Sequence, residues 1–139
     1  MKRGVKLVEY PLSKHAKEQI RTKTGKTLDD INITNILNGN ITSEDIKISK
    51  ETLQKQGDIA KKAGREQLQQ NFMRAGELTA VEDELILEIY EMLRPYRSTK
   101  EELLAMAERL EKEYQAFHCG ALLRETAEVY EKRKIVANR

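Results

Sequence analysis

The chain has 139 residues, of which 35% are charged and 39% hydrophobic, with a formal net charge of +2 and no tryptophan. This length fits one domain, and an abundance of Lys, Glu, Leu and Ala is typical of helices with narrow apolar faces. The sequence has no run of about 18 apolar residues and no apolar segment of about 7 residues behind its basic start, which argues against a membrane-spanning helix and a secretory signal. We therefore expect a cytoplasmic helical protein, and the single cysteine, Cys119, agrees with a reducing compartment.

Basic residues are concentrated at the two ends of the chain, whereas acidic residues prevail in the middle. A nucleic-acid-binding protein would more usually gather its positive charge on one face, among aromatic or base-reading side chains. The N-terminal basic residues here are scattered, which favours a solvated segment over a nucleic-acid contact. A stand-alone helical adaptor or nucleic-acid-binding domain stays open as the alternative reading.

Residues 1–32 are predicted to form an extended basic N-terminal arm, and residues 33–139 a single helical domain. The arm shows no sustained hydrophobic period, and its only apolar cluster is Tyr10, Pro11 and Leu12. An isolated chain has little reason to order such an arm. We therefore expect it to lie either on its own domain or on a neighbouring chain.

A short helix is predicted around residues 33–38, with Gly39 as its C-terminal cap. Thr42, with Asp45 three residues later, then has the spacing of a capping box and predicts a single helical turn. Residues 46–48 follow as a short extended piece, without a partner strand in the sequence.

The longest helical pattern runs from Ser49 to about Thr79 and contains Gly57, Gly64 and Gly76. Each glycine costs up to about 1 kcal/mol relative to Ala inside a helix, so each needs a reason. Gly64 could end a first helix as its cap, or the glycines could let another backbone approach closely. Because the apolar phase is kept across Gly64, we favour one continuous helix.

The next helix opens with the acidic residues 82–84, whose charges suit its positive end. Its apolar stripe is predicted to be buried and consists of Leu85, Ile86, Ile89, Tyr90 and Leu93, widened by Leu87 and Met92. Pro95 cannot continue this helix, because it lacks an N–H group and its ring clashes with the preceding turn. Ser98 and Glu101 then have the spacing of a capping box, which predicts that the following helix begins there.

The corner between these two helices carries Arg94, Tyr96 and Arg97. We expect no residue nearby in the sequence to neutralise the two guanidinium groups. Arginine and tyrosine are enriched among the residues that dominate binding at protein interfaces. The corner is therefore predicted to dock on another protein.

The helix after the corner has an apolar stripe that repeats at spacings of 4, 3, 4 and 3 residues. The stripe consists of Leu103, Ala107, Leu110, Tyr114 and Phe117. From Cys119 onward the apolar residues lie on a different phase, which predicts a bend or break near residues 115–120 with a contribution from Gly120. Together, the three main periodic segments predict an all-α fold.

No set of residues makes a convincing active site or metal centre. His118 and Cys119 point about 100° apart on a helix and lack further ligands at zinc-site spacing, so we interpret them as a surface imidazole beside a buried thiol. Asp29–Asp30 and Glu82–Glu84 precede or open helices, where capping explains carboxylates better than catalysis does. Gly25–Thr27 lacks the earlier glycine of a phosphate-binding loop. We therefore predict no catalytic, cofactor-binding or metal-binding residue in this chain.

Five segments, in one order along the chain, carry a family resemblance. They are Y-P-L at Tyr10–Leu12, G-K-T-L-D-D-I at Gly25–Ile31, E-L-T-A-V at Glu77–Val81, I-L-E-I-Y at Ile86–Tyr90 and L-R-P-Y-R-S-T-K-E-E-L-L-A at Leu93–Ala105. From about residue 10 to about residue 134, the chain resembles the small subunit of the adenosylcobalamin-dependent diol and glycerol dehydratases. None of the five segments is a catalytic signature, so the specificity comes from their common order.

The resemblance implies a fold, a set of partners and a cofactor. The family fold of this subunit is an open three-helix up-and-down bundle with extra N-terminal structure. In these dehydratases, large, medium and small subunits form a dimer of heterotrimers, and adenosylcobalamin lies between the large and medium subunits. A radical mechanism converts 1,2-propanediol or glycerol into an aldehyde in the large subunit. The small subunit packs on the outside of the large one and takes part in no chemical step.

The resemblance also implies an interface. We expect contact mainly with the large subunit, through the apolar cluster of the arm and the residues of the corner: Tyr10, Pro11, Leu12, Arg94, Tyr96 and Arg97. The preferred substrate stays open, because the substrate pocket lies in another subunit. Nine residues precede Tyr10, whereas relatives packaged in bacterial microcompartments often have a longer extension. Any packaging is therefore expected to depend on the partner subunits.

Overall fold

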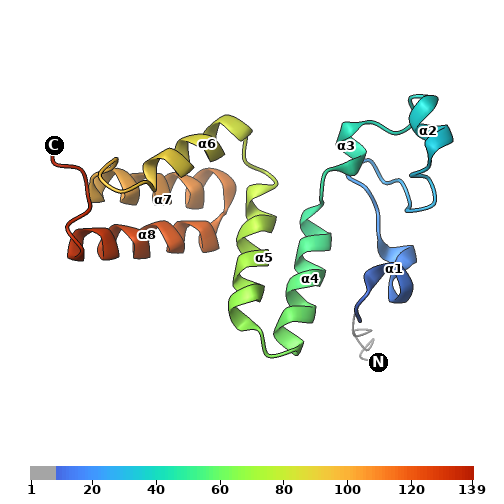
Figure 1. Cartoon of the computed structure of the whole chain (residues 1–139), viewed down its shortest axis with the longest axis horizontal. Coiled ribbons are helices and arrows are strands. Elements are labelled where there is room, and N and C mark those ends of the chain that lie inside the picture. The colour runs from blue at the N-terminus through green and yellow to red at the C-terminus, as the bar shows by residue number, and fades with distance from the viewer. Residues whose placement is uncertain (1–8) are drawn as a thin grey trace. The chain divides into compact units, whose positions relative to one another are not determined.

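The computed structural model describes residues 9–139, and all regular structure in that range is helical (Figure 1). The elements are α1 (Leu12–His15), the short 3-10 helix η1 (Lys17–Gln19), α2 (Ile33–Leu37), α3 (Ser43–Ile46), α4 (Lys50–Lys62), α5 (Glu66–Leu78), α6 (Asp83–Met92), α7 (Lys100–Tyr114) and α8 (Phe117–Lys132). The all-α prediction is confirmed for this range, whereas the open three-helix up-and-down arrangement stays a prediction. Within the same range, no helix combines the length and the apolar character needed to cross a membrane.

The chain divides into two compact units, one ending at Phe72 and the other beginning at Met73, inside α5. The sequence predicts a different boundary, between an arm of residues 1–32 and a domain of residues 33–139. This division stays a prediction.

The arm of the first unit is only partly extended, because it contains α1, η1 and a tight turn. Leu12 in α1 is buried, with 6% of its surface exposed. The turn closes through hydrogen bonds from the Thr22 amide to the Lys26 carbonyl and from the Gly25 amide to the Thr22 carbonyl, both 2.9 Å long. Gly25 has φ of +89°, a conformation that glycine adopts without strain.

Asp45 in α3 holds this turn against the following helical segment. Its buried carboxylate accepts a hydrogen bond of 2.9 Å from the Thr42 amide, within the capping box that the sequence predicted. The same carboxylate lies 3.0 Å from Lys26 Nζ and accepts hydrogen bonds from the hydroxyls of Thr22 and Thr24. The hydrogen bonds from Thr24 and Thr42 lower the pKa of Asp45, although burial acts in the opposite direction. One carboxylate thus fixes four residues of the arm and of the cap.

The prediction of one continuous helix through Gly64 is wrong, because α4 ends at Lys62. Gly64 has φ of +76°, and its amide donates to the Lys61 carbonyl at 2.9 Å. The Arg65 amide donates to the Ala60 carbonyl at 2.9 Å, which completes a glycine C-terminal cap. A hairpin of two helices can keep the same apolar phase as one long helix, so the periodicity did not distinguish them.

Gly57 in α4 allows a close approach between two helices, which was the second explanation considered for the glycines of this segment. A Cβ atom placed there would lie 3.4 Å from the Cβ atom of Phe72 and 3.6 Å from Cγ of Gln69, both in α5. The helices α4 and α5 therefore pack closely at this position.

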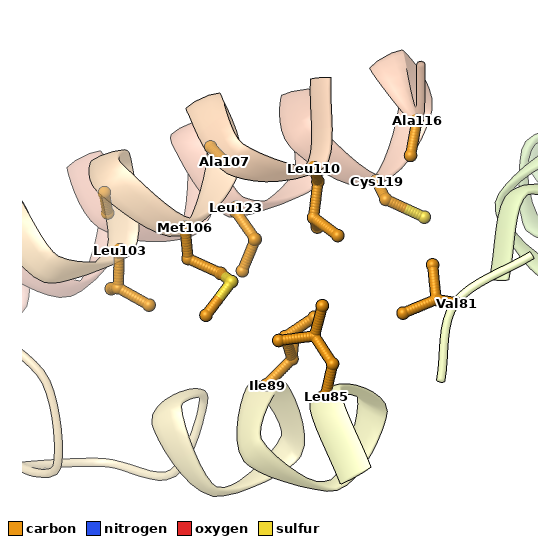
Figure 2. Packing of buried hydrophobic residues seen from close by; sticks show 11 residues of the cluster. Val81, Leu85, Ile89, Leu103, Met106, Ala107, Leu110, Ala116, Cys119 and Leu123 are labelled. Atoms are coloured by element: carbon orange, nitrogen blue, oxygen red, sulfur yellow. The ribbon is translucent and has the colours of Figure 1, made fainter. Parts of the chain in front are cut away.

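The core of the second unit is made by α6, α7 and α8 together (Figure 2). Leu85 and Ile89 point from α6 toward Leu110 and Leu123 of the other two helices. The buried cluster consists of Val81, Leu85, Ile89, Leu103, Met106, Ala107, Leu110, Ala116, Cys119, Leu123 and Ala127. Each fully buried leucine stabilises the fold by about 1.5–3 kcal/mol relative to an exposed one. The predicted buried stripes are confirmed at Leu85, Ile89, Leu103, Ala107 and Leu110.

The predicted break near residues 115–120 is confirmed, but its cause is different. α7 ends with Gln115 in the left-handed conformation, with φ of +51°, and α8 begins at Phe117. Phe117 is 61% exposed, so its assignment to the buried stripe of the preceding helix is wrong. Gly120 lies inside α8, where an added Cβ atom would lie 2.5 Å from the carboxylate of Glu111 in α7. This glycine serves helix packing rather than the break.

The predicted cap of α7 is displaced by one residue. Thr99 Oγ1 accepts a hydrogen bond of 3.2 Å from the Glu102 amide, and Glu102 accepts one of 3.0 Å from the Thr99 amide. Ser98, which was expected in this role together with Glu101, is buried instead. The sequence S-T-K-E-E contains the capping-box spacing twice, so spacing alone did not distinguish the two registers.

Candidate functional site

The corner between α6 and α7 is held in place by the C-terminal segment of the chain. The amide of Tyr96, a residue with φ of +65°, donates to the Ile135 carbonyl at 2.7 Å. The Ala137 amide donates to the Ser98 carbonyl, and Arg139 Nη2 to the Arg97 carbonyl, both at 2.9 Å. The corner is therefore a fixed backbone structure. No sequence pattern predicts these contacts, because they join irregular segments that are far apart in the chain.

The two predicted docking arginines are paired, contrary to the expectation that nothing nearby would neutralise them. Arg94 Nη1 lies 3.1 Å from Glu91 Oε2, and Arg97 Nε lies 3.4 Å from Glu91 Oε1. Glu91 lies in the last turn of α6, and Arg94 follows it by three residues, just beyond the end of that helix. Both arginine side chains remain more than half exposed, and surface ion pairs are worth only about 0–1 kcal/mol. They can exchange this partner for another carboxylate at low cost.

A groove of about 720 Å³ runs beside the corner. It is lined by Glu88, Glu91, Met92, Arg97, Ser98, Glu102, Ala105, Met106, Arg109 and Arg139. Its charged lining contains three carboxylates and three guanidinium groups, so the charges balance. Such a lining suits a polar protein surface better than an anionic small molecule.

Exposed apolar residues continue from the corner along α6. Leu87 is 67% exposed, Tyr90 is 62% exposed and Tyr96 is 64% exposed. Leu87 and Tyr90 were predicted to belong to the buried stripe, and this prediction is wrong. α6 is apolar around much of its circumference but buries only the face that carries Leu85 and Ile89. The outer face is therefore available to a partner.

The arm contributes less exposed apolar surface than predicted. Tyr10 is 69% exposed, whereas Leu12 is buried inside the first unit. Pro11 is half-buried. Of the cluster, Tyr10 alone offers a large exposed side chain. The assignment of these residues and of the corner to a subunit interface stays a prediction.

Glu77, His118 and Cys119 form the most organised polar cluster of the second unit. Glu77, at the end of α5, accepts hydrogen bonds from the backbone amides of His118 at 2.9 Å and Cys119 at 2.8 Å. His118 Nδ1 lies 2.8 Å from the same carboxylate. Ala116, in the cap position of α8, has no side-chain oxygen, so Glu77 supplies the missing cap from another helix. These contacts indicate a structural role for the cluster, namely the capping of α8.

The pKa values in this cluster agree with a structural role. Burial alone would raise the pKa of Glu77, but the amides of Cys119 and His118 outweigh it and the pKa is lowered. Burial, together with the neighbouring Glu77, raises the pKa of Cys119 to about 12. A thiol with this pKa is not a nucleophile near neutral pH. The interpretation of Cys119 as a buried thiol beside a surface imidazole is confirmed, since its exposed fraction is 7% and that of the His118 side chain is 41%.

The acidic clusters that the sequence offered also have structural partners. Asp30 accepts hydrogen bonds from the amide and the hydroxyl of Thr27 at 2.8 and 2.9 Å, which lower its pKa. Glu82 accepts a hydrogen bond from the hydroxyl of Tyr114. Between residues 9 and 139, no group of three or more His, Cys, Asp or Glu side chains is arranged to hold a metal ion.

Comparison with known proteins gives one consistent family. Residues 5–137 match the family model described as dehydratase small subunit. The propanediol dehydratase small subunit of Salmonella typhimurium is 54% identical over 132 residues, covering 95% of this chain and 76% of that protein. The propanediol dehydratase small subunit of Citrobacter freundii is 53% identical over 129 residues, covering 93% of this chain and 75% of that protein. The chain therefore belongs to the dehydratase small-subunit family.

Proposed function

We propose that this chain is the non-catalytic small subunit of an adenosylcobalamin-dependent dehydratase that converts 1,2-propanediol or glycerol into the corresponding aldehyde. The observation that carries the proposal is the identity of 54% over 132 residues with a propanediol dehydratase small subunit. Because this relative is named a propanediol dehydratase small subunit, we favour propanediol over glycerol as the substrate. We further propose that α6, α7 and α8, which share one core, correspond to the up-and-down bundle of the family.

The cofactor is proposed to lie in the partner subunits and not in this chain. The groove beside the corner does not fit adenosylcobalamin, because six of its ten lining side chains are charged. The organised carboxylates described above, Asp45 and Glu77, are used as helix caps. We assign no step of the reaction to this chain. The complete enzyme is proposed to be a cytoplasmic dimer of heterotrimers, and any enclosure in a microcompartment is proposed to be directed by the partner subunits.

The role of this chain is proposed to be docking on the large subunit through the corner. Tyr96 and Arg97 lie on a backbone fixed by the C-terminal clasp, so little conformational freedom is lost when they bind. Truncating a central interface residue commonly costs about 2 kcal/mol or more, so Tyr96→Ala or Arg97→Ala should weaken assembly by roughly thirtyfold. Glu125→Ala, at an exposed position on α8, is the matched control.

Co-expression of this chain with the large and medium subunits tests the proposal. The three chains should co-purify, and the complex should have dehydratase activity when adenosylcobalamin is added. The isolated chain should show neither activity nor cofactor binding by equilibrium dialysis. Binding of the cofactor by the isolated chain would contradict the non-catalytic assignment, and failure to co-purify would contradict the subunit assignment. Complexes of the corner variants that stay intact on dilution would show that the corner only braces the bundle.

A further inference from the structure

The outward side of α6 carries a stripe of four exposed residues. Leu87 is 67% exposed and Tyr90 is 62% exposed, although both side chains are large and apolar. Asp83 begins the helix and Arg94 follows its last turn, and both are exposed. The Arg94 amide donates to the Glu91 carbonyl at 3.2 Å, so the helical turn continues to this residue. The stripe is thus acidic at its start, apolar in its middle and basic at its end.

The stripe lies on the side of α6 that faces away from the core. Figure 2 shows Leu85 and Ile89 pointing from α6 into the core of the second unit. Successive residues of an α-helix are about 100° apart, and the stripe has spacings of 4, 3 and 4 residues. Its residues therefore share one side of the helix, opposite Leu85 and Ile89. The packing of α6 on α7 and α8 leaves this side uncovered.

The order of the stripe is complementary to itself. Leu87 and Tyr90 are centred midway between residues 88 and 89, and Asp83 and Arg94 are centred on the same point. A two-fold axis through this point places a second copy of α6 antiparallel to the first. Leu87 then lies against Tyr90 of the second copy, and Asp83 lies against Arg94 of the second copy. The antiparallel helix dipoles also attract each other.

Arg94 can exchange its present partner for the carboxylate of a second copy. Its Nη1 atom lies 3.1 Å from Glu91 Oε2, and Arg97 Nε lies 3.4 Å from the other oxygen of the same carboxylate. One carboxylate thus serves two guanidinium groups. Exposed ion pairs are weak, so Arg94 can turn to Asp83 of a second copy while Arg97 keeps Glu91.

The charge of α6 argues against other classes of partner. Between its bounds, Asp83 and Met92, the helix contains four acidic residues and no basic one. Nucleic acids and anionic membranes are bound through Lys and Arg, so this composition disfavours both. An unlike protein could cover an apolar patch with any arrangement of charges around it. The shared centre of the apolar pair and the charged pair is a requirement only of a two-fold contact between identical chains.

We infer that the outward face of α6, formed by Asp83, Leu87, Tyr90 and Arg94, pairs with the same face of a second copy of this chain around a two-fold axis. Two large exposed apolar side chains per copy make a small contact, which is typical of a weak and transient pair. The inference concerns the free chain and does not rest on the proposed function. The two are tested on different samples, so either can fail alone.

Sedimentation equilibrium of the isolated full chain, from about 10 μM to about 1 mM, tests the pairing. The wild type should pass from monomer to dimer without larger species, because a two-fold contact is used up in one pair. The variant Leu87→Ser/Tyr90→Ser should raise the dissociation constant at least about tenfold. Its unfolding temperature should stay that of the wild type, because both side chains are already exposed. A wild-type chain that stays monomeric throughout, or that forms larger species, would overturn the inference.

Charge reversal tests the orientation of the two copies. Asp83→Arg and Arg94→Asp should each prevent self-pairing, since each places like charges together at both ends of the pair. Mixed in equal amounts, the two variant chains should pair with each other, because both ends again join opposite charges. Glu125→Arg, an equal change of charge at an exposed position of α8, should pair like the wild type. Undiminished self-pairing of either single variant, or a mixture that does not pair, would show that the antiparallel contact is wrong.

Discussion

Removal of the Glu77 side chain should destabilise the start of α8 more than any exposed substitution on the same helix. Glu77 is 9% exposed at its side chain and satisfies two amide donors, those of His118 and Cys119. In Glu77→Ala both donors lose their partner, and no residue at the cap position can replace it, because Ala116 has no polar side chain.

The expected magnitude follows from the number and type of the lost hydrogen bonds. Hydrogen bonds to a charged acceptor contribute about 1.5–3 kcal/mol each, and loss of a helix cap costs about 0.5–2 kcal/mol overall. Because the two bonds belong to one cap, they do not add fully, and we expect a loss of about 2–3 kcal/mol. That loss should lower the midpoint of thermal unfolding by roughly 5–10 °C in a chain of this size. Glu77→Gln should lie between Glu77→Ala and the wild type, since it keeps an acceptor but loses the charge.

The pH dependence provides a second readout. The pKa of Glu77 is lowered in the folded chain, from an ordinary value of 4.5. Its stabilising contribution is therefore complete above pH 4.5 and is lost as the pH falls through the lowered, folded value. The difference in unfolding temperature between wild type and Glu77→Gln should narrow as the pH is lowered below 4.5. Thermal unfolding followed by circular dichroism at neutral pH and at a pH below 4.5 measures this difference, with Glu125→Ala as the exposed control. Equal unfolding temperatures for Glu77→Ala and Glu125→Ala at neutral pH would refute the capping argument.

Three further substitutions or treatments test individual contacts. Thr99→Ala should lower the stability of the chain by about 0.5–2 kcal/mol in urea unfolding, because Thr99 and not Ser98 caps α7. Gly57→Leu should cost about 1–3 kcal/mol through a clash with Phe72, whereas Gly57→Ala should be tolerated, and the two unfolding curves would coincide if α4 and α5 did not pack there. Cys119, whose pKa is raised to about 12 by burial, should react with iodoacetamide only after unfolding, and rapid alkylation of the native chain by mass spectrometry would show that the thiol is accessible.

Periodicity predicted the core of the second unit well but did not predict its limits. Leu85, Leu103 and Leu110 are buried as the spacing indicated. Tyr90 lies outside the core, because a helix with apolar residues around most of its circumference does not reveal which side its neighbours will cover. The burial of one face is decided by tertiary packing, which a single helical pattern does not contain.

Local capping chemistry was predictable where the pattern occurred once and ambiguous where it occurred twice. The box of Thr42 and Asp45 is present as predicted. The cap of α2 was not predicted and is a single hydrogen bond that Asn32 accepts from the Asn35 amide. At the start of α7 the pattern allowed Ser98 or Thr99, and the buried position of Ser98 decided between them. Contacts between distant segments, such as Glu77 with α8 and the C-terminal clasp on the corner, leave no signature in a single sequence. The ion-pair environment of Arg94 and Arg97 was therefore predicted wrongly, whereas the assignment of the corner to an interface stays a prediction.

The contrast between fully hydrogen-bonded polar groups and exposed apolar side chains indicates where this chain needs a partner. Among residues 9–139, every buried side-chain nitrogen or oxygen has a hydrogen-bond partner. Three carboxylates cap a helix or fix a loop, those of Asp45, Glu77 and Glu102. A chain that satisfies its polar groups internally and leaves large apolar side chains on rigid exposed elements can gain further stability only by covering those side chains. Among the described residues, α2 in the first unit and the outer face of α6 in the second are two surfaces of this kind, and assembly should depend on covering such surfaces.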